Sequence, residues 1–184
     1  MAVKKPSSSF VLGLTAMISF SVLFATHLVT EPILINRANE ADLTLLNLDS
    51  FANYDIGEVE QATGELLASG IQTIKPFLQN NNVVAVTYSV ITSGYAQGLT
   101  YRIGIREGRI QLIIVDAHNE TPGYGGNVIS QLQTTLAQQP IADTNAWTAA
   151  LVSVSTGATF TRRGLVNSLT AIRTDYLARV GGQG

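Results

Sequence analysis

The first part of the chain is a long apolar stretch. No Asp, Glu, Lys or Arg occurs from Pro6 to Thr30. A helix of roughly 20 apolar residues spans the hydrocarbon core of a bilayer. Because Lys4 and Lys5 precede the stretch, we expect a transmembrane helix within residues 1–30, with its N-terminus in the cytoplasm. A cleaved signal peptide and a buried core helix are the alternative interpretations.

Residues 31–184 have the length of one domain of ordinary size. Apolar residues three and four positions apart predict a short helix over residues 31–48. These residues are Leu34, Ala38, Ala41 and Leu45. Residues 49–64 are rich in turn formers, and no regular element is predicted there.

The middle of the domain alternates between apolar and polar residues, as strands with one buried face do. The apolar positions are Val84, Val86, Tyr88, Val90, Leu99, Tyr101, Ile103, Ile105, Ile110, Leu112 and Ile114. Short connections at 80–82, 93–98 and 107–108 indicate antiparallel neighbours. We therefore expect an antiparallel meander over residues 71–117, with Tyr101 in the core.

Helical patterns return after the predicted sheet. Residues 130–138 have helical composition, and a longer C-terminal helix has an apolar face made of Leu165, Leu169, Ile172, Tyr176 and Val180. Thr159 or Thr161 is its predicted N-cap, and Gly181 follows its last turn. An antiparallel sheet with flanking helices gives an α+β domain. Trp147 is expected to be a packing residue.

Composition excludes several functional classes. The chain has no cysteine, so it has no disulfide and no thiolate ligand for a metal or an iron–sulfur cluster. His27 and His118 lie far apart in the sequence, and no metal site is expected. The formal net charge is −2, with no basic block beyond Arg162 and Arg163, which argues against nucleic acid as a partner.

A loop of small and hydroxyl residues leads into the last helix. Val154 to Thr161 reads Val-Ser-Thr-Gly-Ala-Thr-Phe-Thr, and two arginines follow within one turn. Backbone N–H groups at a helix start attract anions such as phosphate. The loop therefore indicates a ligand that carries a phosphate. The alternative is that Thr159 only caps the helix.

A second loop follows the last predicted strand. Residues 118–126 read His-Asn-Glu-Thr-Pro-Gly-Tyr-Gly-Gly. Proline and glycine make a tight loop and let the backbone approach a flat ligand. Taken alone, the segment is better explained as a turn that ends a strand.

Together the two loops resemble the signatures of a known family. Thr156-Gly157-Ala158-Thr159 resembles the flavinylation motif of the FMN-binding subunits of Rnf-type and sodium-pumping quinone reductase complexes, and Glu120 to Gly125 resembles their Glu-Thr-Pro-Gly-x-Gly motif. The resemblance extends over 95–169 and is greatest to the small FMN-binding subunits of Rnf-type complexes. It implies an FMN-binding domain over residues 31–184 that relays electrons between ferredoxin and NAD in an ion-translocating complex.

The resemblance also implies roles for individual residues. Thr159 would carry FMN covalently through a phosphoester, after modification by a separate flavin transferase. The predicted contacts with the phosphate and the ribityl chain are Ser155, Thr156, Gly157, Ala158 and Arg162. The predicted contacts with the flavin are Glu120, Thr121, Pro122, Gly123 and Tyr124. The alternatives are that Glu120 caps its own loop and that Arg162 and Arg163 face solvent or a partner subunit.

The resemblance further implies the location and the partners. The domain would lie in the periplasm, anchored in a bacterial inner membrane, next to other membrane subunits of an Rnf-type complex. One departure from the family supports a different function. The family has an Asp shortly before the motif, whereas residues 151–154 contain no acid and Asp143 is the nearest one upstream. The alternatives are therefore a structural or assembly subunit without covalent flavin, and a periplasmic flavoenzyme domain released by signal cleavage.

Overall fold

The computed structural model describes residues 8–154 and 157–181. The chain divides into two units, Met1–Ala41 and Asp42–Gly184. Helix α1 (Ser8–Leu46) continues from the first unit into the second. The helix ends where Asn47 adopts a φ of 52° and Leu48 N–H donates to the Leu43 carbonyl at 2.9 Å. This is the usual hydrogen-bonding pattern at a helix C-terminus, with a left-handed residue just after the helix.

The expectation of a transmembrane helix is wrong. Within residues 8–154 and 157–181, no helix combines the length and the apolar character needed to cross a bilayer. Polar groups interrupt the apolar stretch of α1. Ser21 and Thr26 donate hydrogen bonds to carbonyls of the preceding helical turn, and His27 Nε2 lies 3.3 Å from a carboxylate oxygen of Glu31.

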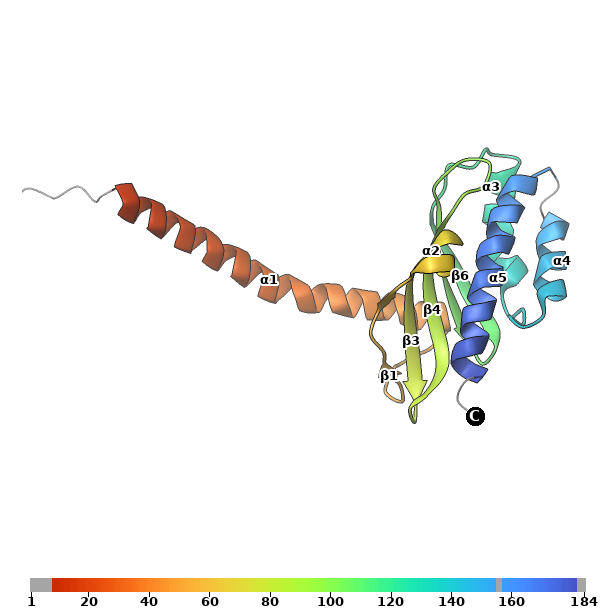
Figure 1. The fold of residues 1–184 in the computed structure, drawn as a ribbon, viewed down its shortest axis with the longest axis horizontal. Coiled ribbons are helices and arrows are strands. Elements are labelled where there is room, and N and C mark those ends of the chain that lie inside the picture. Colours follow the sequence, from red (N-terminus) through yellow and green to blue (C-terminus); the bar gives the residue numbers. More distant parts are fainter. Residues whose placement is uncertain (1–7, 155–156, 182–184) are drawn as a thin grey trace, which may run out of the picture. The chain divides into compact units, whose positions relative to one another are not determined.

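The second unit is built on an antiparallel sheet (Figure 1). Strands follow the order β1-β3-β4-β5-β6, and β2 also pairs with β3. All pairings are antiparallel. The strands are β1 (Asp55–Ile56), β2 (Glu60–Gln61), β3 (Ile71–Gln79), β4 (Asn82–Thr92), β5 (Leu99–Arg106) and β6 (Arg109–Ala117). The predicted meander over residues 71–117 is thus confirmed.

Two of the hairpin turns follow directly from their residues. Asn80 and Asn81 both have positive φ (52° and 65°), as do Glu107 and Gly108 (54° and 71°). Two-residue turns of this kind match the twist of the flanking strands, and Asn and Gly are the residues that adopt them most readily. These turns place β3 beside β4 and β5 beside β6.

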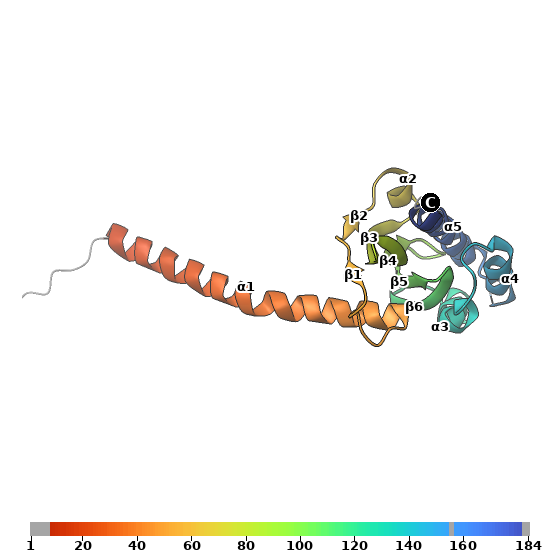
Figure 2. The same ribbon diagram turned by 90° about the horizontal axis from the view of Figure 1, so that it is seen from below.

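Helices cover one face of the sheet, as Figure 2 shows for α3 and α5. The helices after α1 are α2 (Gly64–Ala68), α3 (Gly125–Leu136), α4 (Thr144–Val154) and α5 (Thr159–Gly181). The main core lies between this layer and the sheet, and Tyr101 and Trp147 are fully buried in it, as expected. A smaller cluster of Leu46, Phe77 and Ala85 packs on the other face.

The α+β architecture is therefore confirmed, with two differences among the helices. α3 begins at Gly125, so the glycine-rich loop leads straight into a helix that was expected only from residue 130. α4 was not predicted. It joins α3 to the segment before α5, and its buried residues are Trp147 and Leu151.

A charged cluster links α5 to the sheet. Arg179 Nε donates to Asp175 at 2.6 Å, and the guanidinium also donates two hydrogen bonds to Glu60 at 2.8 and 2.7 Å. Asp175 in turn accepts the hydroxyl hydrogen of Tyr88 at 2.8 Å. Hydrogen bonding from Arg179 holds the pKa of Glu60 below its ordinary value of 4.5.

We expect Arg179→Met to lower the free energy of unfolding by about 1–3 kcal/mol at pH 7, because charged hydrogen bonds are lost and Asp175 keeps only a neutral partner. A carboxylate with a lowered pKa stabilises the fold above its unfolded pKa and loses this effect as pH falls through the folded pKa. The difference in the free energy of unfolding between the variant and wild type should therefore be smaller at acidic pH. Urea unfolding at pH 7 and pH 3.5 checks this, and an equal difference at both pH values would contradict it.

Candidate functional site

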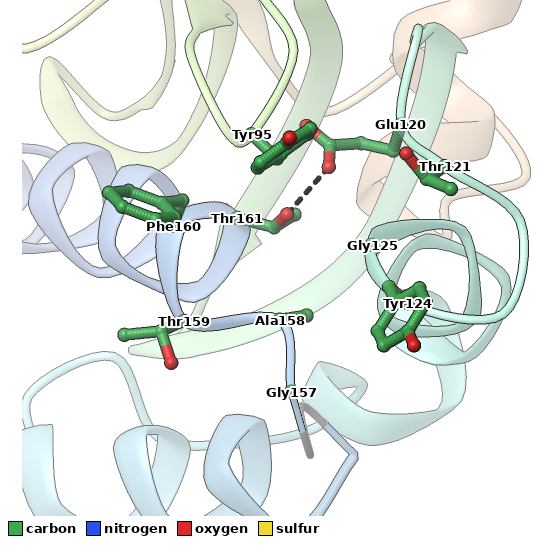
Figure 3. A pocket seen from close by; sticks show the side chains of 10 residues that line it. All are labelled: Tyr95, Glu120, Thr121, Tyr124, Gly125, Gly157, Ala158, Thr159, Phe160 and Thr161. Atoms are coloured by element: carbon green, nitrogen blue, oxygen red, sulfur yellow. Dashed lines mark hydrogen bonds between the residues drawn. The ribbon is translucent and has the colours of Figure 1, made fainter.

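A pocket of about 310 Å³ lies where three segments of the second unit meet. One is the connection between β4 and β5, another is the loop between β6 and α3, and the third is the start of α5 (Figure 3). The lining residues are Tyr95, Glu120, Thr121, Tyr124, Gly125, Gly157, Ala158, Thr159, Phe160 and Thr161. Both loops that the sequence singled out thus contribute to one pocket.

Ala158, the residue before α5, offers no side-chain cap to the start of the helix. The Ala158 carbonyl accepts the N–H of Arg162 at 3.0 Å, so Ala158 occupies the N-cap position. Its methyl group cannot accept a hydrogen bond from the N–H groups of the first turn. The predicted N-cap, Thr159 or Thr161, is therefore wrong. Gly157, with a φ of 80°, supplies the left-handed residue just before this turn.

Thr159 is the first residue of α5, and it is exposed on the pocket. In the part of the chain that the structure describes, its hydroxyl has no hydrogen-bond partner. An exposed hydroxyl beside the N–H groups at a helix start is the arrangement expected for an acceptor of a phosphate-bearing group. The neighbouring hydroxyl of Thr161 differs, because it is buried and donates to Glu120 Oε2 at 2.7 Å.

Glu120 is a buried carboxyl residue of the pocket, with 5% of its surface exposed. Oε2 is the acceptor for Thr161, whereas Oε1 is buried and has no hydrogen-bond partner among the residues that the structure describes. Gly94 and Gly125 lie against the carboxylate, and a Cβ on either would collide with it. The β4–β5 connection and the loop between β6 and α3 therefore enclose this carboxylate. Its hydrogen bond from Thr161 joins both to the first turn of α5.

Exposed aromatic side chains border the pocket. Tyr95, Tyr124 and Phe160 are 76%, 62% and 57% exposed. The rings of Tyr95 and Phe160 lie 6.4 Å apart between centroids, and the Arg163 guanidinium lies 5.8 Å from the Phe160 ring centroid. Large aromatic side chains left exposed at a pocket are suited to binding a flat ligand.

The sequence-derived site agrees only in part with the pocket. Of the candidates for flavin contact, Glu120, Thr121 and Tyr124 line it, whereas Pro122 and Gly123 are exposed and do not. Arg162 is half-buried in the first turn of α5 and does not line the pocket. Gly157, Ala158 and Thr159 do line it, and Ser155 and Thr156 fall outside the described residues.

Three lining residues were not among the predicted contacts: Gly125, Phe160 and Thr161. Tyr95, which the sequence offers as a ring that could stack on the flavin, lines the pocket as well. The contact of Thr161 with Glu120 joins residues 41 positions apart, so no local pattern gave a signal for it. The position of Tyr95 depends on the β4–β5 connection and could not be deduced from local pattern. Within residues 8–154 and 157–181, no three His, Cys, Asp or Glu side chains form a metal site.

We expect Gly125→Ala to lower the free energy of unfolding by about 1–3 kcal/mol, because the added methyl group overpacks the carboxylate and the hydroxyl of Thr161. The matched control is Gly126→Ala, where the nearest atom is the Thr121 carbonyl oxygen at 3.3 Å. Urea unfolding of both full-length variants checks the prediction. Equal stability losses would contradict it.

Comparison with known proteins identifies a family for the segment that builds this pocket. The FMN-binding domain family matches residues 94–173, from the β4–β5 connection into α5. No curated protein matches the chain.

The pocket fits FMN in chemistry. The N–H groups at the start of α5 suit the phosphate, exposed aromatic rings suit the isoalloxazine, and Oε1 of Glu120, which has no partner among the described residues, suits a donor on the ligand. Its volume lies at the lower end of the range for small-molecule sites. Residues 94–173 of this chain therefore match the FMN-binding domain family, and FMN is the cofactor that this match supports.

Proposed function

We propose that this chain is an electron-transfer subunit that carries FMN through a phosphoester to Thr159 and relays electrons within an Rnf-type complex. The observation that carries the proposal is the exposed Thr159 residue, which lies on the pocket, at a helix start, within the matched segment. A separate flavin transferase would form the ester between Thr159 Oγ1 and the FMN phosphate.

Charge at the start of α5 supports an anionic ligand. Arg162 and Arg163 lie in the first turn, at the positive end of the helix dipole. A negative charge is favourable at this end of a helix, and the first turn of α5 contains no acid. A phosphate bound to the N–H groups at this helix start would supply that charge.

The exposed aromatic side chains and Glu120 support binding of the isoalloxazine ring in the part of the pocket away from the start of α5. Tyr95, Tyr124 and Phe160 offer flat surfaces, and Glu120 offers an acceptor. When bound, FMN supplies the redox chemistry, and the protein supplies attachment, orientation and electrostatics. A covalent tether would keep the carrier at a fixed site while electrons pass to and from neighbouring subunits.

Membership of an Rnf-type complex rests on the resemblance of the two motifs. The partners on this proposal are the other subunits of that complex and the transferase that attaches the flavin. The chain would hold one carrier and pass electrons on, which is the role of a relay rather than of an autonomous enzyme.

One observation favours a structural or assembly subunit without covalent FMN. The residues just before the motif, 151–154, contain no acid and belong to α4. Asp143 lies at the opposite end of this helix, about 16 Å away at 1.5 Å per residue. Its Oδ1 accepts the N–H of Ala146 at 3.0 Å and so caps α4. Asp143 therefore does not substitute for the missing acid.

Acid precipitation of the full chain from its own cells tests the proposed function. We expect yellow flavin to stay in the protein pellet, to redissolve with the protein in denaturant, and to lose its colour on reduction by dithionite. Flavin released into the supernatant would show FMN that is bound without an ester. A colourless protein would favour the structural subunit.

A further inference from the structure

We propose that Glu120 Oε1 accepts a hydrogen bond from the imide N3–H of the isoalloxazine ring, so that the pyrimidine edge of the flavin faces Glu120. This inference rests on the proposed function and names the group that orients the ring. It also assigns Glu120 a ligand role distinct from capping its own loop.

The starting observation is an unsatisfied acceptor. Glu120 is 5% exposed, Oε2 is bound by Thr161, and Oε1 is buried without a partner. Buried polar groups in proteins almost always have hydrogen bonds, and an ionised carboxylate left without one is strongly unfavourable. Oε1 therefore needs a donor, and Glu120 lines the pocket in which a ligand would supply it.

Glycines on two loops make room for this carboxylate. A Cβ at Gly94 would meet Oε1, and a Cβ at Gly125 would meet Oε2. Both loops thus lie against the carboxylate at glycines, which have no side chain, and Thr161 donates a hydrogen bond to one of its oxygens. A side chain held in this way is preorganised, so its free oxygen has a defined position before a ligand arrives.

The chemistry of the acceptor selects the ligand group. A carboxylate only accepts hydrogen bonds, so its partner must be an N–H or an O–H donor. Oxidised flavin carries one ring N–H, at N3. The ribityl hydroxyls are the other donors of FMN, but they lie next to the phosphate. Figure 3 shows Thr159 and Glu120 on different sides of the first turn of α5, so a phosphate at Thr159 places the ribityl chain away from Glu120.

Tyr95 lines the same pocket as Glu120. It is 76% exposed, and its ring centroid lies 6.4 Å from that of Phe160. A flavin that enters between Tyr95 and Glu120 would stack on the tyrosine and bring its imide edge to the carboxylate. Movement of an exposed ring has a small energetic cost, because little buried surface is lost.

The test compares FMN with 3-methyl-FMN, in which a methyl group replaces the N3 hydrogen. The full chain is prepared without flavin transferase, and binding is followed by quenching of flavin fluorescence. We expect wild type to bind 3-methyl-FMN about 10- to 100-fold more weakly than FMN, the effect of a charged hydrogen bond. Glu120→Ala should bind both flavins equally, whereas the control Val152→Ala, at an exposed position on α4 that does not line the pocket, should retain the preference.

A second variant tests the inference without relying on the correct folding of Glu120→Ala. Glu120→Gln preserves side-chain size and removes the charge. Because a carboxylate beside N3 opposes its deprotonation, the N3–H of bound FMN should titrate at a higher pH in wild type than in Glu120→Gln, as followed by flavin absorbance. Wild type that binds the two flavins equally, or N3–H titrations that coincide, would overturn the inference and leave FMN binding intact. Wild type that binds neither flavin would contradict the proposed function itself.

Discussion

The full chain with Thr159→Ala, expressed together with the flavin transferase, should carry no covalent flavin. Alanine lacks the oxygen that forms the ester, so the loss should be complete rather than partial. Under ultraviolet light in a denaturing gel, wild type should fluoresce and the variant should be dark. Thr159 is exposed at the first position of α5, and substitution of exposed residues usually changes stability by less than about 0.5 kcal/mol. Unfolding would therefore not explain a dark band.

Two matched variants separate the acceptor from its surroundings. Thr121→Ala removes another exposed hydroxyl residue from the lining of the same pocket and should keep the fluorescence. Thr159→Ser restores a hydroxyl at the acceptor position and should regain it. A fluorescent Thr159→Ala band, or a Thr121→Ala band that is equally dark, would contradict the assignment of Thr159.

Trp147→Ala should be the most destabilising of the substitutions considered, with a loss of about 3–5 kcal/mol in the free energy of unfolding. Trp147 is fully buried in the main core, and its indole N–H donates to the Ile141 carbonyl at 3.2 Å. Its removal leaves a large cavity and an unpaired carbonyl beneath α4. Urea unfolding of the full chain measures the effect.

Comparison within the same helix distinguishes packing from helix propensity. Val152 lies on α4 and is 50% exposed, so Val152→Ala should change stability little. Trp147→Phe should fall between the two, because it keeps most of the apolar volume and loses the N–H donor. Equal losses for Trp147→Ala and Val152→Ala would show that α4 is not held by its buried tryptophan.

The strands could be predicted because apolar and polar residues alternate along them in the sequence. Tyr101, Ile103 and Ile105 are fully buried, whereas Arg102 between them is partly exposed and pairs with Asp116 across the sheet. Alternation of this kind is a local property and is visible in the sequence. The two-residue turns are equally local, since Asn and Gly are the residues that accept positive φ.

α4 has a local signal that was missed. Its buried residues, Trp147 and Leu151, recur with the half-buried Ala150 and Val154 at three- and four-residue spacing, which is the pattern of a helix with one apolar face. The error at α1 has a different origin. The stretch has no charged residue, but its hydroxyl and imidazole groups also reduce its apolar character.

In the candidate site, too, some residues could be predicted from local sequence and others could not. Thr159, Glu120 and Tyr124 belong to contiguous motifs, and the structure brings these motifs to one pocket. Tyr95 enters from a different loop, and its place depends on strand pairing. Thr161 does not cap α5, because its hydroxyl hydrogen-bonds Glu120, a residue far away in the sequence. Contacts of this kind are set by the fold and are not visible in local pattern.

The most direct test of covalent FMN at Thr159 is peptide mapping by mass spectrometry of the chain purified from its own cells. Proteolysis should release a peptide containing residues 157–162 that is heavier by one FMN less one water, and fragmentation should place the added mass on Thr159. An unmodified peptide in chain that is otherwise intact, or the added mass on another residue, would contradict the account.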